Sequence, residues 1–413
     1  MKRNWTWQLS FRYFWGKRSG NAVPILSRIS MAAIAIGSAA LIILFSVFNG
    51  FEDIVKNLYK AFYPDIKITA ARGKFFIPPN NMGMSLSVRA GVAHYSYVIE
   101  DNVLANSEEE QIISTLKGID TNYLKVNDVG DYMVAGRKQV ADSPVPTALV
   151  GLRLANQVGA DVNKPFPYSY LVLYYPDAKN KNPILDPENA FHSLKLKPDG
   201  TFKIQDDFDS KYILAPLNLV QDLFNEPGKI SSIEIKLTAQ ADAEAVKNNL
   251  QQFIGPAFKV ETRYEQNKTL YLVMRSEKWA VYAILLFILL IASFNMVGAL
   301  SLLVLEKRKD IAILKIMGAE PAAIHRIFIT EGLIWSLSGG LAGMLLGFMV
   351  CWGQQHFHWI KLEGSFIIDA YPVHMQWQDF IWVLLNIMAV GLLAAWYPAR
   401  RATATEDPSL KSA

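Results

Sequence analysis

Side chains able to carry out chemistry are sparse in this sequence. His356 and His358 stand two residues apart, and His374 follows in the same polar stretch. Two imidazoles at this spacing point to one side of a strand, so they could chelate a metal there. No Cys or carboxylate stands beside them at ligand spacing, and we therefore predict no metal site.

Catalytic motifs are missing in the same way. Glu108, Glu109 and Glu110 are adjacent and cannot share one helix face, so we interpret them as a solvated charge run. The sequence has no HExxH or GxSxG motif, and none of its Gly-Lys pairs stands in a P-loop. Cys351 is the only cysteine and lies in an apolar run. We expect no catalytic residue and no cofactor bound by this chain.

Composition points to a membrane instead. Hydrophobic residues make up 51% of the 413 residues, and the net charge is only +4. No basic stripe interleaved with aromatic residues appears, which argues against nucleic-acid binding. Residues 29–51, 279–305, 332–353 and 380–398 carry no charge. Because about 20 helical residues cross the hydrocarbon core of a bilayer, each stretch predicts a transmembrane helix.

The distribution of Lys and Arg predicts the orientation. Fourteen of them lie in the N-terminal segment, the 306–328 loop and the C-terminal tail, whereas Lys361 is the only one in 354–379. Positive flanks stay in the cytoplasm, so both termini and the 306–328 loop should lie there. The predicted layout is a cytoplasmic or interfacial segment 1–28, helices 29–51, 279–305, 329–353 and 380–398, outer regions 52–278 and 354–379, the 306–328 loop, and a tail 399–413.

Two features of the membrane segments predict contacts. The N-terminal stretch mixes Trp and Phe with basic residues, which fits either a helix lying in the membrane interface or an aromatic belt before the first span. The third span repeats a GxxxG spacing, and small residues on one face let another helix approach closely. We therefore predict a helix-packing surface at Gly339, Gly343 and Gly347.

The large outer region reads as a mixed α+β domain. Residues 64–69, 170–175, 211–216 and 230–237 are rich in β-branched and aromatic residues and predict strands. Residues 216–225 and 239–254 have helical spacing. Residues 71–84 and 176–200 are rich in turn-forming residues, so we expect exposed loops there.

A short charged and apolar stretch, EKRKDIAILKIMGAEP (306–321), separates the second and third spans. Asp310 can cap a helix whose apolar positions are Ile311, Leu314 and Met317, and Gly318 fits its end. Pro321 fits the first turn of the next helix. The residues alone leave two interpretations equally open: a docking device, or an amphipathic turn resting on lipid headgroups.

Resemblance to a known family favours docking. Residues 294–332 resemble the signature of ABC-transporter permeases of the lipoprotein-releasing group, within the superfamily that includes FtsX and the macrolide exporters. Residues 29–55, 360–380 and 397–410 are similar to the first span, the outer loop and the C-terminal end of that group. This resemblance implies a MacB-like, type VII permease: four transmembrane helices, with a large α+β periplasmic domain between the first and second.

The resemblance also implies partners. An ABC ATPase carrying ATP and Mg²⁺ would dock on a coupling helix, and the permease would pair with a second copy or a sibling. Lipoprotein cargo, a periplasmic lipoprotein carrier and membrane lipids complete the set, at the bacterial inner membrane. The coupling-helix contacts carried over from the family are Glu306, Lys309, Asp310, Ile311, Leu314, Lys315, Met317 and Gly318.

In this family an apolar cavity between the first and second spans receives acyl chains. The matching positions are Leu44, Phe45, Val47, Phe48 and Phe51 on the first span and Leu285, Ile288, Leu289 and Ile291 on the second. Any one of these residues could instead face lipid or pack the bundle. An alternative function is an FtsX-like or exporter-like permease that couples an ATPase to periplasmic events without moving lipoproteins. A membrane-anchored periplasmic enzyme is a third hypothesis, weakened by the missing catalytic residues.

Overall fold

The computed structural model describes residues 22–79, 82–87, 89–106, 111–138, 146–160, 162, 170–177, 190–361 and 370–404. The chain divides into two compact units. The helical unit takes the described residues up to Ile54 and those from Leu272 onward, and the inserted domain is Val55–Tyr271. Each unit has its own apolar core.

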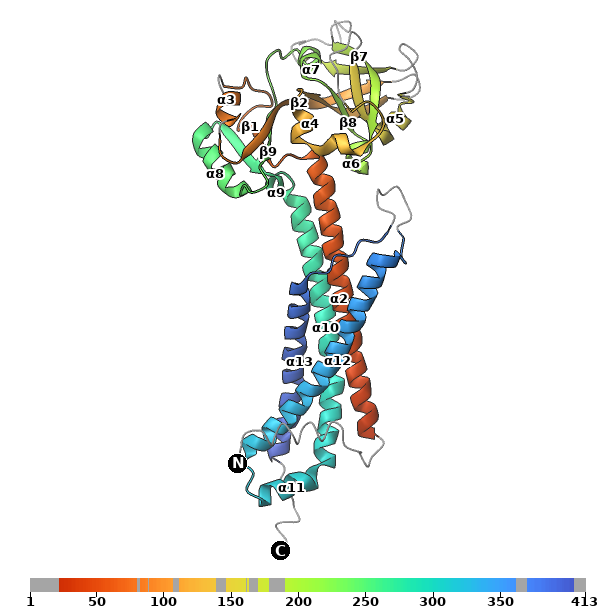
Figure 1. Ribbon diagram of the computed structural model, residues 1–413, viewed down its shortest axis with the longest axis vertical. Coiled ribbons are helices and arrows are strands. Elements are labelled where there is room, and N and C mark those ends of the chain that lie inside the picture. Colours follow the sequence, from red (N-terminus) through yellow and green to blue (C-terminus); the bar gives the residue numbers. More distant parts are fainter. Residues whose placement is uncertain are drawn as a thin grey trace. The chain divides into compact units, whose positions relative to one another are not determined.

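Four long helices build the helical unit (Figure 1). They are α2 (Ala22–Phe62), α10 (Lys268–Glu306), α12 (Pro321–Phe357) and α13 (Trp377–Ala404), with the short α11 (Arg308–Ile316) between α10 and α12. All four long helices are long and apolar enough to cross a membrane. The order of one span, an inserted domain and three spans is therefore the architecture that the sequence predicts.

The helices reach beyond the uncharged stretches at most ends. The last eight residues of α2, Val55–Phe62, belong to the inserted domain, and α10 likewise begins within that domain. α12 continues to Phe357, into the stretch that the sequence assigns to an outer loop. Residues 1–21 of the predicted interfacial segment, 362–369 of the outer loop and 405–413 of the tail lie outside the described residues.

Buried side chains from all five helices form the core of the helical unit. Leu41 and Phe45 of α2, Leu289 of α10, Trp335 of α12 and Ile387 of α13 belong to one apolar cluster. Ile311 of α11 joins the same cluster, so the short helix is packed onto the bundle by one face. Because α11 lies outside the predicted spans, burial of Ile311 away from water is worth about 1.5–3 kcal/mol and helps to hold α11 on the bundle.

The described strands of the inserted domain form a ten-stranded mixed sheet. They are β1 (Ile66–Ala70), β2 (Val92–Asn106), β3 (Gln111–Ile119), β4 (Met133–Gly136), β5 (Thr147–Gly151), β6 (Leu171–Pro176), β7 (Phe191–Phe202), β8 (Tyr212–Pro216), β9 (Ser232–Leu237) and β10 (Phe258–Thr262). The helices are α3 (Met82–Ser87), α4 (Tyr123–Val126), α5 (Leu152–Gln157), α6 (Asp206–Asp209), α7 (Leu217–Leu223), α8 (Ala243–Ile254) and α9 (Arg263–Gln266), with a 3₁₀ turn at Asp128–Tyr132.

Six of the strands close into a ring. The pairing runs β2–β3–β8–β5–β7–β6 and returns to β2, with β3–β8 and β5–β7 parallel and the other pairs antiparallel. All six contribute buried residues to one core, which α5 and α7 complete. Closure removes the free edges that these strands would otherwise expose. β1, β9 and β10 extend the sheet beyond β2 and carry a separate core with α8.

The two predicted loops are wrong in part. β7 occupies Phe191–Phe202, within a stretch that the sequence assigns to a loop because of its Pro, Asn, Asp and Lys content. Pro198 is tolerated there because the β5–β7 pairing shifts register between Ala148 and Leu149, where the ladder is irregular. In the other predicted loop, Phe76 bridges Ile230, and α3 begins at Met82. Residues 178–189 lie outside the described part of the chain.

Candidate functional site

The candidate docking element is α11, which follows α10 after a single residue. It begins at Arg308 and ends at Ile316, and Gly318 stops it with φ +83°. Gly318 N donates to Lys315 O at 3.0 Å, and Ala319 N donates to Leu314 O at 2.9 Å. These two bonds form a Schellman motif, which a glycine accommodates without steric cost. Glu320 then caps α12, with Pro321 at its first position.

Asp310 is not the helix cap that the sequence predicts. The cap is Lys307, and Asp310 lies in the first turn, where its carboxylate is 3.1 Å from Lys307 Nζ. The helix starts three residues earlier than expected, because Arg308, Lys309 and Asp310 already have helical geometry. A carboxylate in the first turn still favours the helix through its dipole.

One face of α11 is apolar, and the described residues of the chain do not cover it. Ile313, Ile316 and Met317 are all more than half exposed, and Ile316 reaches 71%. The opposite face rests on the bundle: Ile311 is only 4% exposed, and Lys315 Nζ donates to Thr403 O of α13 at 3.1 Å. Packing of one face against the bundle thus leaves the other as an apolar docking face, which we define as Ile313, Ile316 and Met317.

The predicted coupling contacts divide between the two faces. Glu306, Lys309, Met317 and Gly318 are exposed, Asp310 and Leu314 are half-buried, and Ile311 and Lys315 lie against the bundle. Ile311 is buried against the bundle, and Lys315 is half-buried with its ammonium bonded to Thr403 O, so the docking roles of both residues stay a prediction. The sequence analysis missed Ile313 and Ile316. The signal for them was present, because apolar residues at 311, 313, 314, 316 and 317 leave two faces to choose from.

A polar cluster lies at the other end of the same bundle. The Asn49 side chain of α2 is 1% exposed, and its Nδ2 donates to Asp379 Oδ2 of α13 at 2.6 Å. Its Oδ1 accepts from Lys278 Nζ of α10 at 2.8 Å. Glu52 lies 3.9 Å from Lys278, and His374 is ion-paired with Asp53 when protonated. One amide thus joins three of the four long helices.

Residues 370–376 pack against this end of α2. His374 N donates to Ser46 O at 2.8 Å, and Phe51 meets Tyr371 edge to face. Gly50 lies directly under the backbone of Pro372, where a Cβ would come within 2.7 Å of the Pro372 carbonyl. The residues after the first span and those of the outer loop, singled out separately in the sequence, are therefore in contact.

The predicted acyl-chain residues also divide into groups. Phe45 and Leu289 are buried in the core of the bundle, where Phe45 stacks on Tyr282 with ring centroids 5.7 Å apart. Because this core already covers them, neither can line a free cavity in this structure. Leu44, Val47, Phe48, Phe51 and Leu285 are half-buried. Ile288 and Ile291 are exposed, and together with Ile284, Phe287 and Phe294 they make one apolar stripe along α10.

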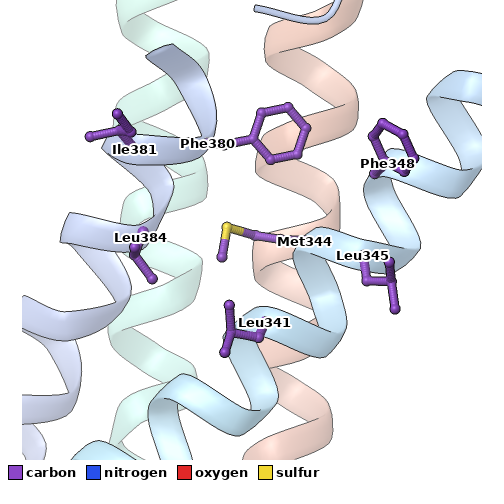
Figure 2. Close-up of a pocket in the computed structure, with 7 residues that line it drawn as sticks. All are labelled: Leu341, Met344, Leu345, Phe348, Phe380, Ile381 and Leu384. Atoms are coloured by element: carbon purple, nitrogen blue, oxygen red, sulfur yellow. The ribbon is translucent and has the colours of Figure 1, made fainter. Parts of the chain in front are cut away.

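An apolar pocket of about 370 Å³ lies between α12 and α13. Leu341, Met344, Leu345 and Phe348 of α12 and Phe380, Ile381 and Leu384 of α13 line it. In Figure 2 the side chains of Met344 and Phe380 project into the space between the two helices. None of the predicted acyl-chain residues lines this pocket. Its lining offers no polar group, so its chemistry suits a hydrocarbon chain.

The glycines of α12 lie against α2. A Cβ at Gly339 would come within 2.6 Å of Met31 O, and one at Gly343 would overlap Ala35 O. Gly347 faces Ile42 and the carbonyl of Ala39. Such close approach of two backbones is the use that GxxxG spacing has in membranes.

The end of α2 is fixed in the inserted domain by a buried charge cluster. Lys117 of β3 is 3% exposed at its side chain, and its Nζ lies 2.7 Å from Glu234 Oε1 and 3.8 Å from Glu100 Oε2. Asn127 donates to the other Glu234 oxygen at 2.6 Å, and Lys67 pairs with Glu100 at 2.8 Å. The Lys117 ammonium also lies over the ring of Phe62, the last residue of α2, at 4.8 Å.

The electrostatics of this cluster favour the charged forms. Burial disfavours the ammonium of Lys117, but the carboxylates of Glu234 and Glu100 outweigh it and raise the pKa of Lys117 above its ordinary value. Burial likewise disfavours the Glu100 carboxylate, yet Lys67 and Lys117 lower the pKa of Glu100 to about 2. Asp209, by contrast, has its pKa raised to about 6 because burial outweighs the backbone donors at Ile204 and Gln205.

The histidines do not come together. His356 lies in α12, where its Nδ1 contacts Trp352 O at 3.1 Å, and His358 is the C-cap of that helix with φ +50°. The strand that would have put both imidazoles on one side is not formed. Among the described residues no three His, Cys, Asp or Glu side chains are grouped to hold a metal ion. Glu108, Glu109 and Glu110 lie outside the described part of the chain.

Comparison with known proteins gives a consistent result. Residues 282–406 match the family described as FtsX-like permease C-terminal. The lipoprotein-releasing system transmembrane protein LolC of Neisseria meningitidis is 24% identical over 410 residues, covering 96% of each chain. LolE of Haemophilus influenzae is 24% identical over 429 residues, covering 98% of each. Both alignments include the spans and the inserted domain.

Among solved structures, the periplasmic region of MacB from Actinobacillus actinomycetemcomitans covers 53% of this chain and 98% of that one. The sequences are 11% identical and the TM-score is 0.37, which is too low to support an argument. The helices and sheet described above define the fold without it. In its near full-length similarity to LolC and LolE and in its FtsX-like C-terminal region, the chain is similar to the LolC/LolE-like permeases.

Proposed function

We propose that this chain is the permease subunit of an ABC transporter that extracts lipoproteins from the bacterial inner membrane and passes them to a periplasmic carrier. ATP hydrolysis would be supplied by a separate ATPase, which binds ATP and Mg²⁺. The observation that carries the proposal is the uncovered apolar docking face of α11 in a chain that resembles LolC and LolE throughout its length.

The docking face supports an ATPase partner. Exposed Glu306, Arg308 and Lys309 precede Ile313, Ile316 and Met317 in the sequence, so charged residues stand at the start of the helix that carries the apolar patch. This is the usual make-up of a protein interface. A helix resting on lipid headgroups would also expose apolar side chains. The ATPase is favoured because the packing of Ile311 and the Lys315–Thr403 bond hold α11 fixed relative to the spans, as force transfer requires.

The proposed orientation places α11 in the cytoplasm and the inserted domain in the periplasm. It is supported by the basic residues that surround α11 and both termini and by the single Lys361 near the other end of the bundle. With the inserted domain in the periplasm, cargo that leaves the outer leaflet would meet that domain before the carrier.

The proposed cargo explains why energy is needed. Each methylene of an acyl chain gains about 0.8 kcal/mol from burial in the bilayer, so a triacylated protein does not leave on its own. The exposed stripe of α10, including Ile288 and Ile291, offers an apolar surface to such chains. A second permease, either another copy or a sibling, would face this stripe and enclose the chains.

The test is a pull-down of the tagged protein from its native membranes in mild detergent, with analysis of bound proteins and acyl chains. Ile113→Asp is the matched control, because Ile113 of β3 is 73% exposed and Ile316 is 71% exposed. We expect wild type and Ile113→Asp to retain an ABC ATPase and lipoproteins, and Ile316→Asp to lose the ATPase. An ATPase without lipoproteins would favour a permease that couples ATP turnover to another periplasmic event. No ATPase in any sample would overturn the proposal.

A photo-crosslinking experiment tests the cargo path separately. A photoreactive side chain at Ile288 or Ile291 should crosslink to lipoproteins, whereas the same group at Met349 of α12, which is similarly exposed and does not line the apolar pocket, should crosslink only to phospholipids. Equal lipoprotein yields at all three positions would mean that the stripe of α10 is ordinary lipid-facing surface.

A further inference from the structure

Asn49 belongs to the polar cluster at the end of the bundle opposite α11. Among the described residues of that cluster, only Asn49 forms hydrogen bonds to two other long helices. It accepts from Lys278 of α10 and donates to Asp379 of α13. Because Asn49 is 1% exposed and its neighbours are charged, water cannot replace these bonds without separating the helices. α2 is therefore held to α10 and α13 by one side chain at this end.

Lys278 and Asp379, the two partners of Asn49, lie on α10 and α13. Both helices are also connected to α11 at the opposite end of the bundle. α10 carries Lys278 ten residues after its start and leads directly into α11. α13 carries Asp379 in its first turn, and the carbonyl of Thr403 near its last residue accepts from Lys315 of α11. Both helices continue without interruption between these contacts. A displacement of α11 would thus reach Asn49 along two helices.

We propose that Asn49, Lys278 and Asp379 form a latch that holds α2 against α10 and α13 and that opens when α11 is displaced. Opening would let α2 and α10 part at the outer end, where acyl chains must enter. This step rests on the proposed function, because it gives the docked ATPase its effect on the cargo path. Lys315 then serves as a positioning residue, since it ties the docking helix to α13.

Cys351 can report latch opening, because its reaction with a thiol reagent depends on its exposure. Cys351 of α12 is the only cysteine in the sequence and is 1% exposed, and its side chain lies next to that of Ser46, one turn before Asn49 on α2. Ser46 also accepts from the backbone of His374. If α2 moves away from the bundle at this end, Cys351 becomes accessible. Alkylation by N-ethylmaleimide therefore measures the separation without any engineered cysteine.

The first experiment uses the full-length protein alone in nanodiscs. Asn49→Leu keeps the branching and the number of heavy atoms of the side chain and removes both inter-helix bonds. We expect alkylation of Cys351 about tenfold faster than in wild type, as the loss of charge-assisted bonds implies. Asn386→Leu is the matched control. It removes the 3.0 Å bond between Tyr282 of α10 and Asn386 of α13 and no hydrogen bond made by α2, so the rate should stay at the wild-type value. Equal rates for wild type and Asn49→Leu, or equal acceleration in both variants, would overturn the latch.

The second experiment adds the co-purified ATPase and MgATP. We expect faster alkylation of wild-type Cys351 and no acceleration in Lys315→Met, which should still bind the ATPase because Lys315 lies off the docking face. Acceleration in Lys315→Met equal to wild type would overturn the role of α13 in release. If no ATPase co-purifies, the proposed function and the release step fail together, while the Asn49→Leu rate still decides whether the latch exists.

Discussion

The inserted domain buries charged side chains, whereas α11 leaves apolar ones uncovered. Lys117 and Glu234 are almost fully buried, and each has an opposite charge or an amide within hydrogen-bonding distance. Ile313, Ile316 and Met317 are more than half exposed, and the described residues of this chain do not cover them. The inserted domain thus satisfies its buried charges within itself, whereas α11 leaves an apolar surface that the proposed partner would cover. Breaking the first region should cost stability, and breaking the second should cost binding.

The largest effect is expected from Lys117→Met. Removal of the ammonium leaves Glu234 without its buried counter-charge, whereas Glu100 keeps Lys67. Breaking a buried pair on one side typically costs about 3–5 kcal/mol. The measurement is thermal unfolding and limited proteolysis of the full-length protein in detergent. Lys117→Met with Glu234→Leu should recover much of the loss, because no uncompensated charge remains. Equal losses in the single and double variants would mean that Lys117 acts by packing on Phe62 instead.

The second-largest effect is expected at low pH, where protonation of Glu100 should destabilise the inserted domain. Glu100 has a folded-state pKa of about 2 against an ordinary value of 4.5, so the folded state favours its ionised form. The stability that this provides is fully present above pH 4.5 and is lost as pH falls from there to about 2, by roughly 2–3 kcal/mol in total. Unfolding of the inserted domain measured across this interval should show the slope, and Lys67→Met should flatten it. An unchanged slope in Lys67→Met would contradict the pairing.

A third prediction concerns the buried side of α11. Ile311→Ala removes a side chain packed in the core of the helical unit, and we expect the free energy of unfolding of that unit to fall by about 2 kcal/mol. ATPase binding should weaken only through the loosened position of α11. If Ile311→Ala leaves stability unchanged and abolishes binding, Ile311 faces the partner and not the bundle.

The smallest expected change in stability belongs to the opposite face of the same helix. Ile313→Ala alters an exposed side chain and should change the free energy of unfolding by less than about 0.5 kcal/mol. It should nevertheless weaken ATPase binding measurably, since interface residues lose contacts on truncation. Ile311→Ala and Ile313→Ala therefore form a pair, two residues apart, with opposite expected profiles in unfolding and binding assays.

Features encoded locally were predictable from the sequence. The spans follow from uncharged runs, and β1, β6, β8, β9, α7 and α8 follow from short apolar or helical patterns. β2 was missed because Glu100 and Asp101 stand in its middle, and only the pairing of Glu100 with Lys67 and Lys117 and of Asp101 with Lys74 makes them acceptable there. The closed ring of strands could not be predicted from the sequence, because its closure pairs strands that are distant in the chain.

The candidate site also has features that the sequence predicts and features that it cannot predict. Gly318 and Pro321 mark the end of α11 and the start of α12, as their backbone preferences predict. The docking face could not be chosen from the pattern, since that choice depends on which side of α11 meets the bundle. The proposed latch could not be predicted for a similar reason. Asn49 forms its hydrogen bonds with residues 229 and 330 positions away in the chain.

The most direct test of the account is a titration of the purified ATPase against full-length wild type, Ile316→Asp and Ile113→Asp in nanodiscs. Both variants place a carboxylate at an equally exposed isoleucine, and only one lies on α11. We predict that Ile316→Asp weakens the dissociation constant by about thirtyfold or more, as for a central interface residue, and that Ile113→Asp binds like wild type. Equal affinity of all three proteins for the ATPase would contradict the assignment of α11 as its docking helix.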